Sequence, residues 1–206
     1  GLENQVLVAD THGAYGKIAA NFYGNPSKKL KLIGVTGTKG KTTVTSLIKA
    51  ILTRTGQKVG LIGTIQNEIG DEVLHTENTT PDAMELERLY RKMVEAGCEY
   101  CVMEVSSHAL DQERIGDSHY EVAGFTNLSH EHLDYHKDME SYFAAKKKLF
   151  SRCDKAVVNV DDAYGRRIAA DCTCPVMTFS LEEEADLRAF QLTCHPDSVD
   201  FRFGYE

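Results

Sequence analysis

The sequence lacks any long apolar run. No apolar stretch in its 206 residues approaches the roughly 18 residues that suggest a membrane-spanning helix. The first residues, Gly1 to Gln5, also lack the basic head and the following apolar stretch of a secretory signal. We therefore expect no membrane insertion and a cytoplasmic location.

An excess of positive charge is absent as well. The chain has 23 Lys and Arg against 31 Asp and Glu, which gives a formal net charge of −8. A field of this sign disfavours nucleic acid and anionic membranes as partners. An anionic small ligand stays compatible with it, provided that the fold gathers a local positive site.

The six cysteines lack the spacing of a small disulfide-stabilised scaffold. In a chain of this size we expect reduced, mostly buried thiols, with Cys153 and Cys194 as packing residues. The apolar content of 42% is enough to bury one good core, so the composition predicts one domain.

Short apolar runs alternate with segments that have apolar residues at helical spacing. The runs predict strands and the intervening segments predict amphipathic helices. This alternation is typical of the α/β class, with a mainly parallel sheet that carries helices on both faces, as in P-loop proteins. The predicted strands are 31–36, 58–64, 100–105, 122–127 and 156–160, and the predicted helices lie at 86–93, at 139–152, at 162–171 and along the apolar face of Val44, Leu47, Ile48, Ile51 and Leu52.

The pattern changes after residue 185. Two runs of alternating polarity, Leu187–Thr193 and Val199–Tyr205, flank the turn residues His195-Pro196-Asp197. They predict a small antiparallel hairpin at one edge of the sheet.

A glycine-rich loop separates the first predicted strand from its helix. It reads Gly37-Thr38-Lys39-Gly40-Lys41-Thr42-Thr43, which is shorter than the common GxxxxGK[ST] spacing. Glycines allow backbone N–H groups to turn toward phosphate oxygens, and the start of the helix adds a partial positive charge. In this setting Lys41 would contact the β- and γ-phosphates, and the Thr42 hydroxyl would bind Mg²⁺.

Two charged residues lie where the pattern predicts burial. Glu104 ends the apolar strand YCVMEV, so its carboxylate would emerge at the carboxyl edge of a parallel sheet, where ligands bind. Lys146 lies in the middle of the apolar arc of the 139–152 helix, whereas Lys147 and Lys148 point away from it. A buried lysine is costly unless it is paired or chemically altered. Both residues are therefore candidates for a functional site.

Several segments resemble the Mur ligase family, and they occur in the order of that family. The resemblance is strong over residues 6–165 and faint afterwards. It is carried by TGTKGKTT in the loop, Asn78-Thr79-Thr80-Pro81, the segment from Glu104 to Leu110 (EVSSHAL) with Gln112 and Arg114, Thr126-Asn127-Leu128, His132-Leu-Asp134-Tyr-His136, and Ala145-Lys146.

The resemblance implies an ATP-dependent ligase that uses Mg²⁺. It implies that the whole loop from Gly37 to Thr43, including Thr38, Lys39 and Gly40, binds ATP. Lys41, His132 and Lys146 would be catalytic. The metal ligands would be Thr42, Glu104, His132 and Lys146, the last as a carbamate formed with CO₂.

The family also implies the substrate and the reaction. A diamino acid would be added to UDP-MurNAc-L-Ala-D-Glu through an acyl phosphate, in peptidoglycan precursor synthesis. EVSSHAL and HLDYH favour meso-diaminopimelate, and L-lysine is the alternative. The predicted contacts with the muramyl substrate are Asn78, Thr79, Thr80, Ser106, Gln112 and Arg114.

Members of this family have an N-terminal uridine-binding domain and a C-terminal domain that receives the amino acid. On that basis residues 1–29 are expected to be a lead-in segment from an N-terminal domain. Residues 30–206 are expected to be the central ATP-binding domain, or most of it. We expect a monomer that has little or no turnover by itself.

The sequence offers three alternatives. His130, His132, Asp134 and His136 faintly resemble the ligand cluster of a dinuclear metallohydrolase, but the spacing differs by one residue. A non-catalytic nucleotide-binding module of the P-loop type is also compatible with the loop.

A zinc site is the third reading. Cys98 and Cys101 could act with Cys172 and Cys174, yet Cys101 opens an apolar strand and a Cys-x-Cys pair is unusual for structural zinc. No zinc site is therefore favoured.

Overall fold

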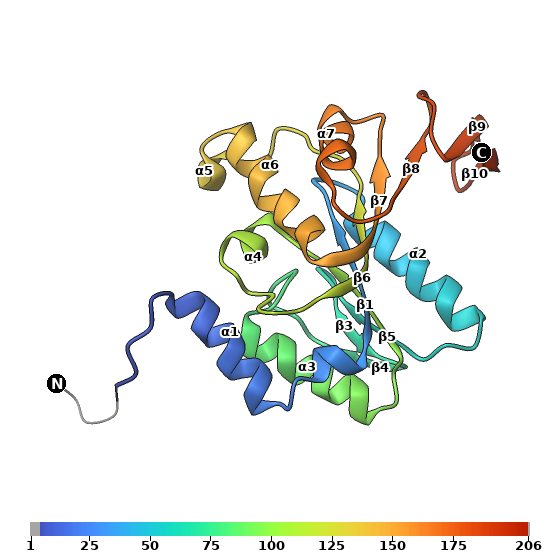
Figure 1. Ribbon diagram of the computed structural model, residues 1–206. Helices are drawn as coiled ribbons and strands as arrows, with labels where there is room; N and C mark the ends of the chain where they lie inside the picture. Colours follow the sequence, from blue (N-terminus) through green and yellow to red (C-terminus); the bar gives the residue numbers. More distant parts are fainter. Residues whose placement is uncertain (1–4, 206) are drawn as a thin grey trace.

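The structure, a computed structural model, describes residues 5–205 and contains a ten-stranded sheet in the order β10-β9-β8-β7-β6-β1-β5-β2-β3-β4 (Figure 1). The strands from β9 to β2 are parallel to their neighbours, whereas β10 at one edge and β3 and β4 at the other pair antiparallel. The strands are β1 (Lys31–Thr36), β2 (Val59–Ile62), β3 (Asn67–Ile69), β4 (Glu72–Leu74), β5 (Tyr100–Glu104), β6 (Tyr120–Phe125), β7 (Cys153–Asn159), β8 (Val176–Ser180), β9 (Leu187–Cys194) and β10 (Val199–Tyr205).

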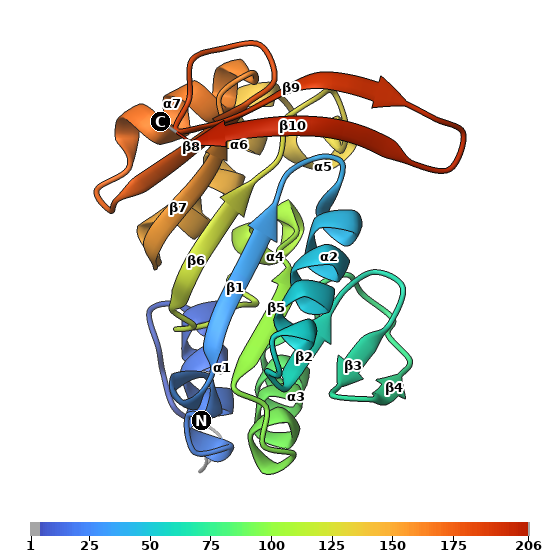
Figure 2. The ribbon, with the colours of Figure 1, turned by 90° about the vertical axis from the view of Figure 1, so that its right-hand side faces the viewer.

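Helices cover both faces of the sheet, as the sequence predicts. Helix α2 lies on one face, and α3, α4, α6 and α7 lie on the other, with α1 outside α3 (Figure 1). Figure 2 looks onto the face covered by α2 and shows the β9–β10 hairpin extending past it. The helices are α1 (Thr11–Phe22), α2 (Lys41–Arg54), α3 (Ala83–Glu95), α4 (Ser107–Asp111), α5 (Leu133–His136), α6 (Met139–Lys147) and α7 (Ala163–Asp171), with short 3₁₀ helices η1 (Pro26–Lys29) and η2 (Lys148–Ser151). None of the helices within 5–205 is both long and apolar enough to cross a membrane.

The two faces bury very different amounts of apolar side chain. The main core lies under α3, α6 and α7, where Tyr90, Met103 and Phe125 are almost fully buried. Under α2 the buried cluster is small, with Val59, Leu61 and Val102 at its centre.

The apolar face predicted for α2 is therefore only partly correct. Ile48 and Leu52 pack on the sheet, but Leu47 and Ile51 are exposed. An apolar stripe on a helix indicates its periodicity, but it does not show how much of the stripe the fold covers.

The parallel strands and the terminal hairpin confirm the predicted fold class, with boundaries shifted by a few residues. The sequence prediction missed the β3–β4 hairpin, β8, and the helices α1, α4 and α5, which are short or weakly patterned. It also extended the helix at 139–152 too far, because the last turn is the 3₁₀ helix η2.

The cysteines are free, and three are buried. Cys153 is a packing residue as predicted, but Cys194 is exposed on β9, so its prediction is wrong. Cys98 and Cys101 lie at β5, whereas Cys172 and Cys174 lie before β8 near Cys153.

The N-terminal helix α1 packs closely against the sheet-covering layer. Gly16, Ala19 and Ala20 form its buried side. A Cβ atom on Gly16 would lie 2.8 Å from the Cα atom of Gly116, so a side chain there would push α1 away. Residues 11–29 thus pack against the rest of the described structure, while the division at residue 29 stays a prediction; residues 1–4 lie outside the described residues.

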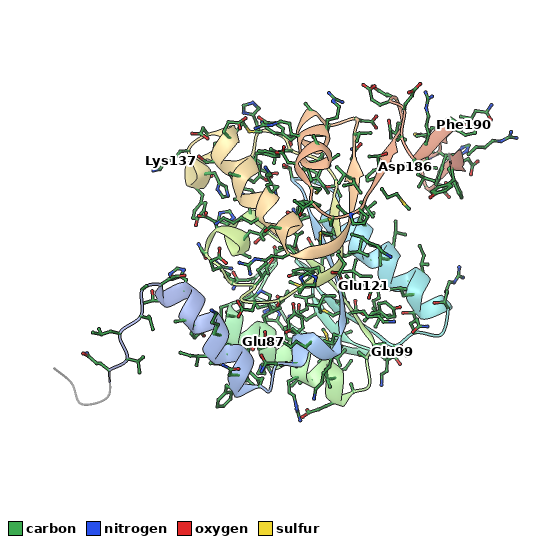
Figure 3. The ribbon with its side chains drawn as sticks, in the orientation of Figure 1. Glu87, Glu99, Glu121, Lys137, Asp186 and Phe190 are labelled. Atoms are coloured by element: carbon green, nitrogen blue, oxygen red, sulfur yellow. The ribbon has the colours of Figure 1, made fainter. Side chains whose placement is uncertain are left out.

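Glu87 is a buried carboxyl on α3, in the region where α1 and α3 meet (Figure 3). It is only 3% exposed, and its Oε2 atom has no hydrogen-bond partner among residues 5–205. Burial, with a smaller contribution from Asp117, raises the pKa of Glu87 from 4.5 to about 7. The folded protein therefore favours the protonated carboxyl.

This shift makes the free energy of unfolding depend on pH. Between 4.5 and about 7 the unfolded chain has lost the Glu87 proton and the folded chain still holds it, so stability falls as pH rises through this window. We predict that Glu87→Gln flattens this slope and raises stability at pH 8 by on the order of 1–3 kcal/mol. Urea unfolding at several pH values measures the effect. Glu72→Gln, at an exposed position on β4, is the control. If the free energy of unfolding had the same dependence on pH in the wild type and in Glu87→Gln, the raised pKa of Glu87 would be contradicted.

Candidate functional site

The candidate site lies at the carboxyl ends of β1, β2 and β5. In an open parallel sheet this edge is where loops converge and ligands bind. A cavity of about 370 Å³ opens there. Most of the residues that the sequence singles out are in its walls, which consist of Thr38, Gly40, Lys41, Thr42, Thr64, Asn78, Thr79, Thr80, Glu104, Ser106, His108, Arg114 and His132.

The glycine-rich loop is held tightly against the end of β6. The Thr38 N–H donates to the Asn127 carbonyl at 2.8 Å, and the Lys39 N–H donates to the Asn127 side-chain oxygen at 3.0 Å. Gly37 has φ +149°, and a Cβ atom there would lie 1.9 Å from the Thr126 hydroxyl oxygen. Glycine is therefore required at Gly37 by both conformation and space.

Two lysines converge on one carbonyl of this loop. Lys41 Nζ donates to the Gly37 oxygen at 2.9 Å and to the Thr38 oxygen at 3.0 Å. Lys146 Nζ donates to the same Gly37 oxygen at 2.8 Å. Burial lowers the pKa of Lys41, although Glu104 and Glu131 oppose the shift. Burial, helped by the nearby Lys41 charge, lowers the pKa of Lys146 well below its usual range.

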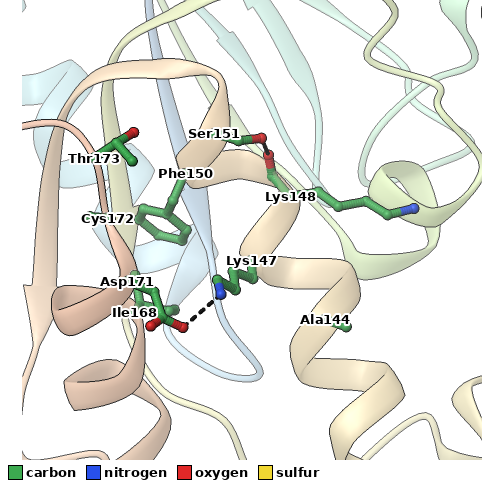
Figure 4. Close-up of a pocket in the computed structure, with 9 residues that line it drawn as sticks. All are labelled: Ala144, Lys147, Lys148, Phe150, Ser151, Ile168, Asp171, Cys172 and Thr173. Atoms are coloured by element: carbon green, nitrogen blue, oxygen red, sulfur yellow. Dashed lines mark hydrogen bonds and ion pairs between the residues drawn. The ribbon is translucent and has the colours of Figure 1, made fainter.

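The burial predicted for Lys146 is confirmed, since its side chain is 1% exposed. Its Nζ atom lies 4.6 Å from the centre of the Tyr142 ring, and the Tyr142 hydroxyl is 3.2 Å from that of Thr38. The neighbouring lysines turn away. Lys147 pairs with Asp171 at 2.6 Å on the wall of a separate cavity of about 320 Å³ between α6 and α7 (Figure 4). The Lys148 amine points away from that cavity and donates to the Leu110 carbonyl of α4 at 3.4 Å.

Glu104 is the buried carboxylate of the site. Its Oε1 atom accepts hydrogen bonds from the Thr42 hydroxyl at 3.0 Å and the Thr64 N–H at 2.8 Å, and its Oε2 atom accepts one from the Thr64 hydroxyl at 3.0 Å. Thr64 is not predicted as a site residue from the sequence. The feature that could have identified it is its position directly after β2, because β2 ends beside β5 at the same edge of the sheet.

The histidines form a cluster of rings beside the cavity. The His108 ring centre lies 5.1 Å from that of His132 and 4.3 Å from that of Tyr135. Burial, followed by the charges of His132 and Arg114, lowers the pKa of His108. His132 faces the cavity, in agreement with its predicted place near Thr42 and Glu104.

The ligand cluster of the metallohydrolase reading does not assemble. His136 is buried and stacked on Tyr142, with its Nε2 atom 2.9 Å from the Ser107 hydroxyl, whereas His130 is exposed. Across residues 5–205 no group of three or more His, Cys, Asp or Glu is arranged to hold a metal ion.

The predicted substrate residues are brought together, with one exception. The Thr80 hydroxyl donates to the Glu104 carbonyl at 2.8 Å and accepts from the Ser106 N–H at 3.0 Å. Asn78 and Thr79 lie on the same wall of the cavity. Gln112 does not line this cavity; instead it accepts a hydrogen bond from Arg114 Nε at 2.8 Å.

Two predicted nucleotide contacts have exposed side chains. Thr43 is the third residue of α2 and is exposed, and Lys39 is exposed at the tip of the loop. Their side chains do not line the cavity, and Lys39 takes part in the loop through its backbone.

The cavity is a positive site in an acidic chain. Lys41 and Arg114, which line the cavity, form no ion pair with any carboxylate of the described residues; Lys41 donates to loop carbonyls, and Arg114 donates to Thr80 and Gln112. A cation without a carboxylate partner is suited to bind an anion from outside the chain. In a chain with a net charge of −8, an anionic ligand needs a local positive site, and this cavity provides one.

Comparison with known proteins gives consistent matches. The family profile "Mur ligase middle domain" matches residues 35–205. The UDP-N-acetylmuramoyl-L-alanyl-D-glutamate--2,6-diaminopimelate ligase of Clostridium perfringens is 45% identical over 206 residues, which cover 98% of this chain and 43% of that protein. Ligase 1 of the same name from Clostridium acetobutylicum is 46% identical over 200 residues, which cover 97% and 42%.

A solved structure of a UDP-N-acetylmuramoyl-L-alanyl-D-glutamate--2,6-diaminopimelate ligase superposes with a TM-score of 0.89 at 30% identity, over 98% of this chain and 43% of that one. The chain thus spans less than half the length of these relatives.

The packing of Gly37 leads to a prediction about the loop. Gly37→Ala should destabilise the chain by about 2–5 kcal/mol, since it combines backbone strain with a steric overlap at Thr126. Gly56→Ala is a matched control, because Gly56 also has a positive φ, +86°, but open space at its Cβ position. Its cost should be the strain alone, about 1–2 kcal/mol. Urea unfolding compares the two variants, and equal losses would show that the close approach at Gly37 is unimportant.

Proposed function

The chain belongs to the Mur ligase family, and from that membership we propose that it is the ATP-binding central part of a ligase that adds a diamino acid to UDP-MurNAc-L-Ala-D-Glu. The similarity to 2,6-diaminopimelate ligases favours 2,6-diaminopimelate as the diamino acid. L-lysine stays the alternative. This reaction would place the protein in peptidoglycan precursor synthesis.

One observation carries the proposal. The glycine-rich loop, the buried Glu104 carboxylate and two cations without carboxylate partners, Lys41 and Arg114, surround a single cavity of about 370 Å³. Lys146 donates to the Gly37 carbonyl of the same loop. A phosphoryl transfer to a carboxylate brings together two anionic reactants, so its main need is fixed positive charge and correct positioning.

The loop and its lysine fit a nucleotide triphosphate. Gly37 and Gly40, with φ of +149° and +85°, turn the backbone ahead of the first turn of α2. Lys41 donates only to loop carbonyls, which phosphate oxygens would replace as acceptors. Thr38, which is 6% exposed, anchors the loop rather than contacting solvent.

Glu104 and Thr42 fit a magnesium ion. Mg²⁺ prefers oxygen ligands and is usually held by one or two protein groups together with water and phosphate oxygens. The Thr42 hydroxyl and the Glu104 carboxylate are already adjacent, at 3.0 Å, and His132 lies on the same cavity. When bound, the ion would neutralise charge on the phosphate oxygens.

The residues of the chain then have distinct tasks in the transfer. Lys41 holds the phosphates, while Arg114 and the 78–80 segment hold the muramyl substrate with its terminal carboxylate toward the loop. Attack of that carboxylate on the γ-phosphoryl group of ATP gives an acyl phosphate and ADP. The amine of the diamino acid then displaces phosphate and forms the amide.

We further propose that Lys146 is carbamylated. The neutral amine attacks CO₂, forms an N–C bond and loses one proton, which leaves an anionic carbamate. Burial and the Lys41 charge lower the pKa of Lys146, which raises the fraction of neutral amine. A carbamate would supply a second carboxylate-like group beside the loop, which the metal site needs because Glu104 is the only carboxylate among the residues that line the cavity.

Two alternatives have less support. A nucleotide-binding module would explain the loop but gives no role to Arg114 and the 78–80 segment. A metallohydrolase would need the histidines to converge, and His136 is instead bonded to Ser107.

The ligase proposal is tested in a polypeptide of full length. This chain would replace the matching segment of the Clostridium perfringens relative, and ADP release would be measured. We expect release that requires both the muramyl dipeptide and diaminopimelate. Lys41→Ala should lower it about 100-fold or more, because a group that stabilises phosphate charge is lost. Lys155→Ala, at an exposed position on β7, should have little effect. Release without the muramyl substrate would favour the nucleotide-binding module.

The carbamate is tested by ¹³C NMR of the 206-residue chain in ¹³C-bicarbonate. We expect one carbamate signal that Lys146→Met removes and Lys147→Met retains. Lys147 is a suitable control because it is the adjacent residue on α6, but its side chain is partly exposed and paired with Asp171. A spectrum without a carbamate signal at saturating bicarbonate and pH 8 would exclude the modification in this chain.

A further inference from the structure

The three residues that follow β6 carry the glycine-rich loop, and we call residues 126–128 the support segment. Asn127 bonds the backbone of Thr38 and Lys39 through its carbonyl and its side chain. The Thr126 hydroxyl donates to the Lys39 carbonyl at 2.7 Å. These contacts join segments that are far apart in the sequence. The position of the loop therefore follows the position of the support segment.

The last residue of the support segment is held by the side chain of Asp162, in the turn before α7. The Leu128 N–H donates to Asp162 Oδ2 at 2.7 Å. Leu128 lies beyond the paired residues of β6, which end at Phe125, so its N–H is not part of the ladder of the sheet. Leu128 is also only 7% exposed. A buried N–H without an acceptor is costly and a carboxylate is a strong acceptor, so this bond fixes the support segment.

Asp162 is fixed in turn by its other oxygen. Its Oδ1 atom accepts the N–H of Tyr164 at 2.8 Å and that of Gly165 at 3.3 Å, and it thereby caps α7. The first turn of α7 packs closely on the preceding turn, because a Cβ atom on Gly165 would lie 1.8 Å from the Asn159 carbonyl oxygen. Asp162 is not one of the residues that line the cavity of the candidate site, so any effect it has there is indirect.

We infer that Asp162 is a positioning residue for nucleotide binding. This inference rests on the proposed function, in which the loop holds the phosphates. One carboxylate joins the start of α7 to the support segment, and the support segment holds the loop at Thr38 and Lys39. A loop that is already ordered binds more tightly than one that must be ordered by its ligand. Asp162 thus raises the affinity for the nucleotide without touching it.

Asp162→Asn separates the two tasks of this side chain. The single oxygen of Asn serves the two N–H groups of α7, since Asn caps a helix as well as Asp does, and the NH₂ group then faces the Leu128 N–H. Asp162→Ser is the second variant, because its hydroxyl also caps a helix but leaves no second acceptor for Leu128. Asp10→Asn is the matched control, since Asp10 caps α1 through the N–H groups of His12 and Gly13.

The first measurement needs no ligand. In amide NMR spectra of the 206-residue chain, Asp162→Asn should shift the signals of Leu128, Thr38 and Lys39, because the loop follows the support segment. Asp10→Asn should leave these three signals unchanged. If Asp162→Asn shifts the signal of Leu128 but not those of Thr38 and Lys39, the support segment does not transmit its position to the loop, and the inference is overturned. Asp162→Ser takes the place of Asp162→Asn if that variant does not fold.

The second measurement is a titration of the same chains with MgATP. Both Asp162 variants should raise the Kd about 3–10-fold, as expected for the loss of one hydrogen bond, and Asp10→Asn should not. A merely structural role would lower the thermal unfolding midpoint and leave the Kd of the folded protein unchanged, which would overturn the inference. If the wild-type chain binds no MgATP, the proposed function fails, while the spectra without ligand still decide whether Asp162 positions the loop.

Hydrogen exchange on the wild-type chain covers the case in which neither variant folds. Because coupling between two sites is reciprocal, saturating MgATP should slow exchange of the Leu128 N–H. Exchange of Ile168, in the middle of α7, reports the general stabilisation by the ligand. We expect a larger slowing at Leu128 than at Ile168. Equal slowing at both, with a larger effect confined to residues 37–43, would contradict the role of Asp162.

Discussion

The meeting of two lysine side chains at the Gly37 carbonyl is the interaction on which the rest of the site depends. Lys41 and Lys146 donate to that oxygen at 2.9 and 2.8 Å, and both side chains are removed from most solvent. Two adjacent ammonium groups with only carbonyl acceptors are costly in a protein interior. The lowered pKa of Lys146 favours loss of its proton, which relieves the repulsion between the two amines. An anionic ligand at Lys41 would remove that repulsion.

The sheet topology explains why this meeting occurs at one place. Strands β1 and β5 are neighbours in the sheet, but the chain continues from β1 to β2 in one direction along the sheet and from β5 to β6 in the other. The loops after β1 and β5 therefore diverge and leave a crevice between them. The loop at Gly37 is bonded to Asn127 after β6, while Glu104 ends β5. Lys146 arrives from α6, more than a hundred residues along the chain from Gly37. Each group is fixed by a different element, and their convergence is a property of the fold.

Much of this could be predicted from sequence, because the signals were local. The loop glycines, the strand that ends at Glu104 and the buried position of Lys146 each follow from spacing within one element. In the structure the loop meets Glu104 at Thr42 and Lys146 at the Gly37 carbonyl. The α/β class and the terminal hairpin followed from alternation in the same way.

What the sequence did not reveal depends on contacts between distant segments. Thr64 has no motif of its own, and its role appears only because β2 lies beside β5. The exposure of Leu47 on α2 was missed because periodicity gives the direction of a side chain but not what covers it. The contact between His12 at the start of α1 and the Gln112 carbonyl after α4 likewise joins segments about a hundred residues apart.

Thr64 would also keep the carboxylate in position with the proposed metal ion bound. An ion at Glu104 would replace the hydrogen bond from Thr42, which contributes about 1 kcal/mol net. Thr64, in the segment after β2, donates two further hydrogen bonds, one to each oxygen of the Glu104 carboxylate. The Thr64 hydroxyl is also 3.0 Å from that of Thr79. Thr64 therefore anchors both the Glu104 carboxylate and the 78–80 segment. As long as the Thr64 contacts hold, a shift of that segment also moves Glu104.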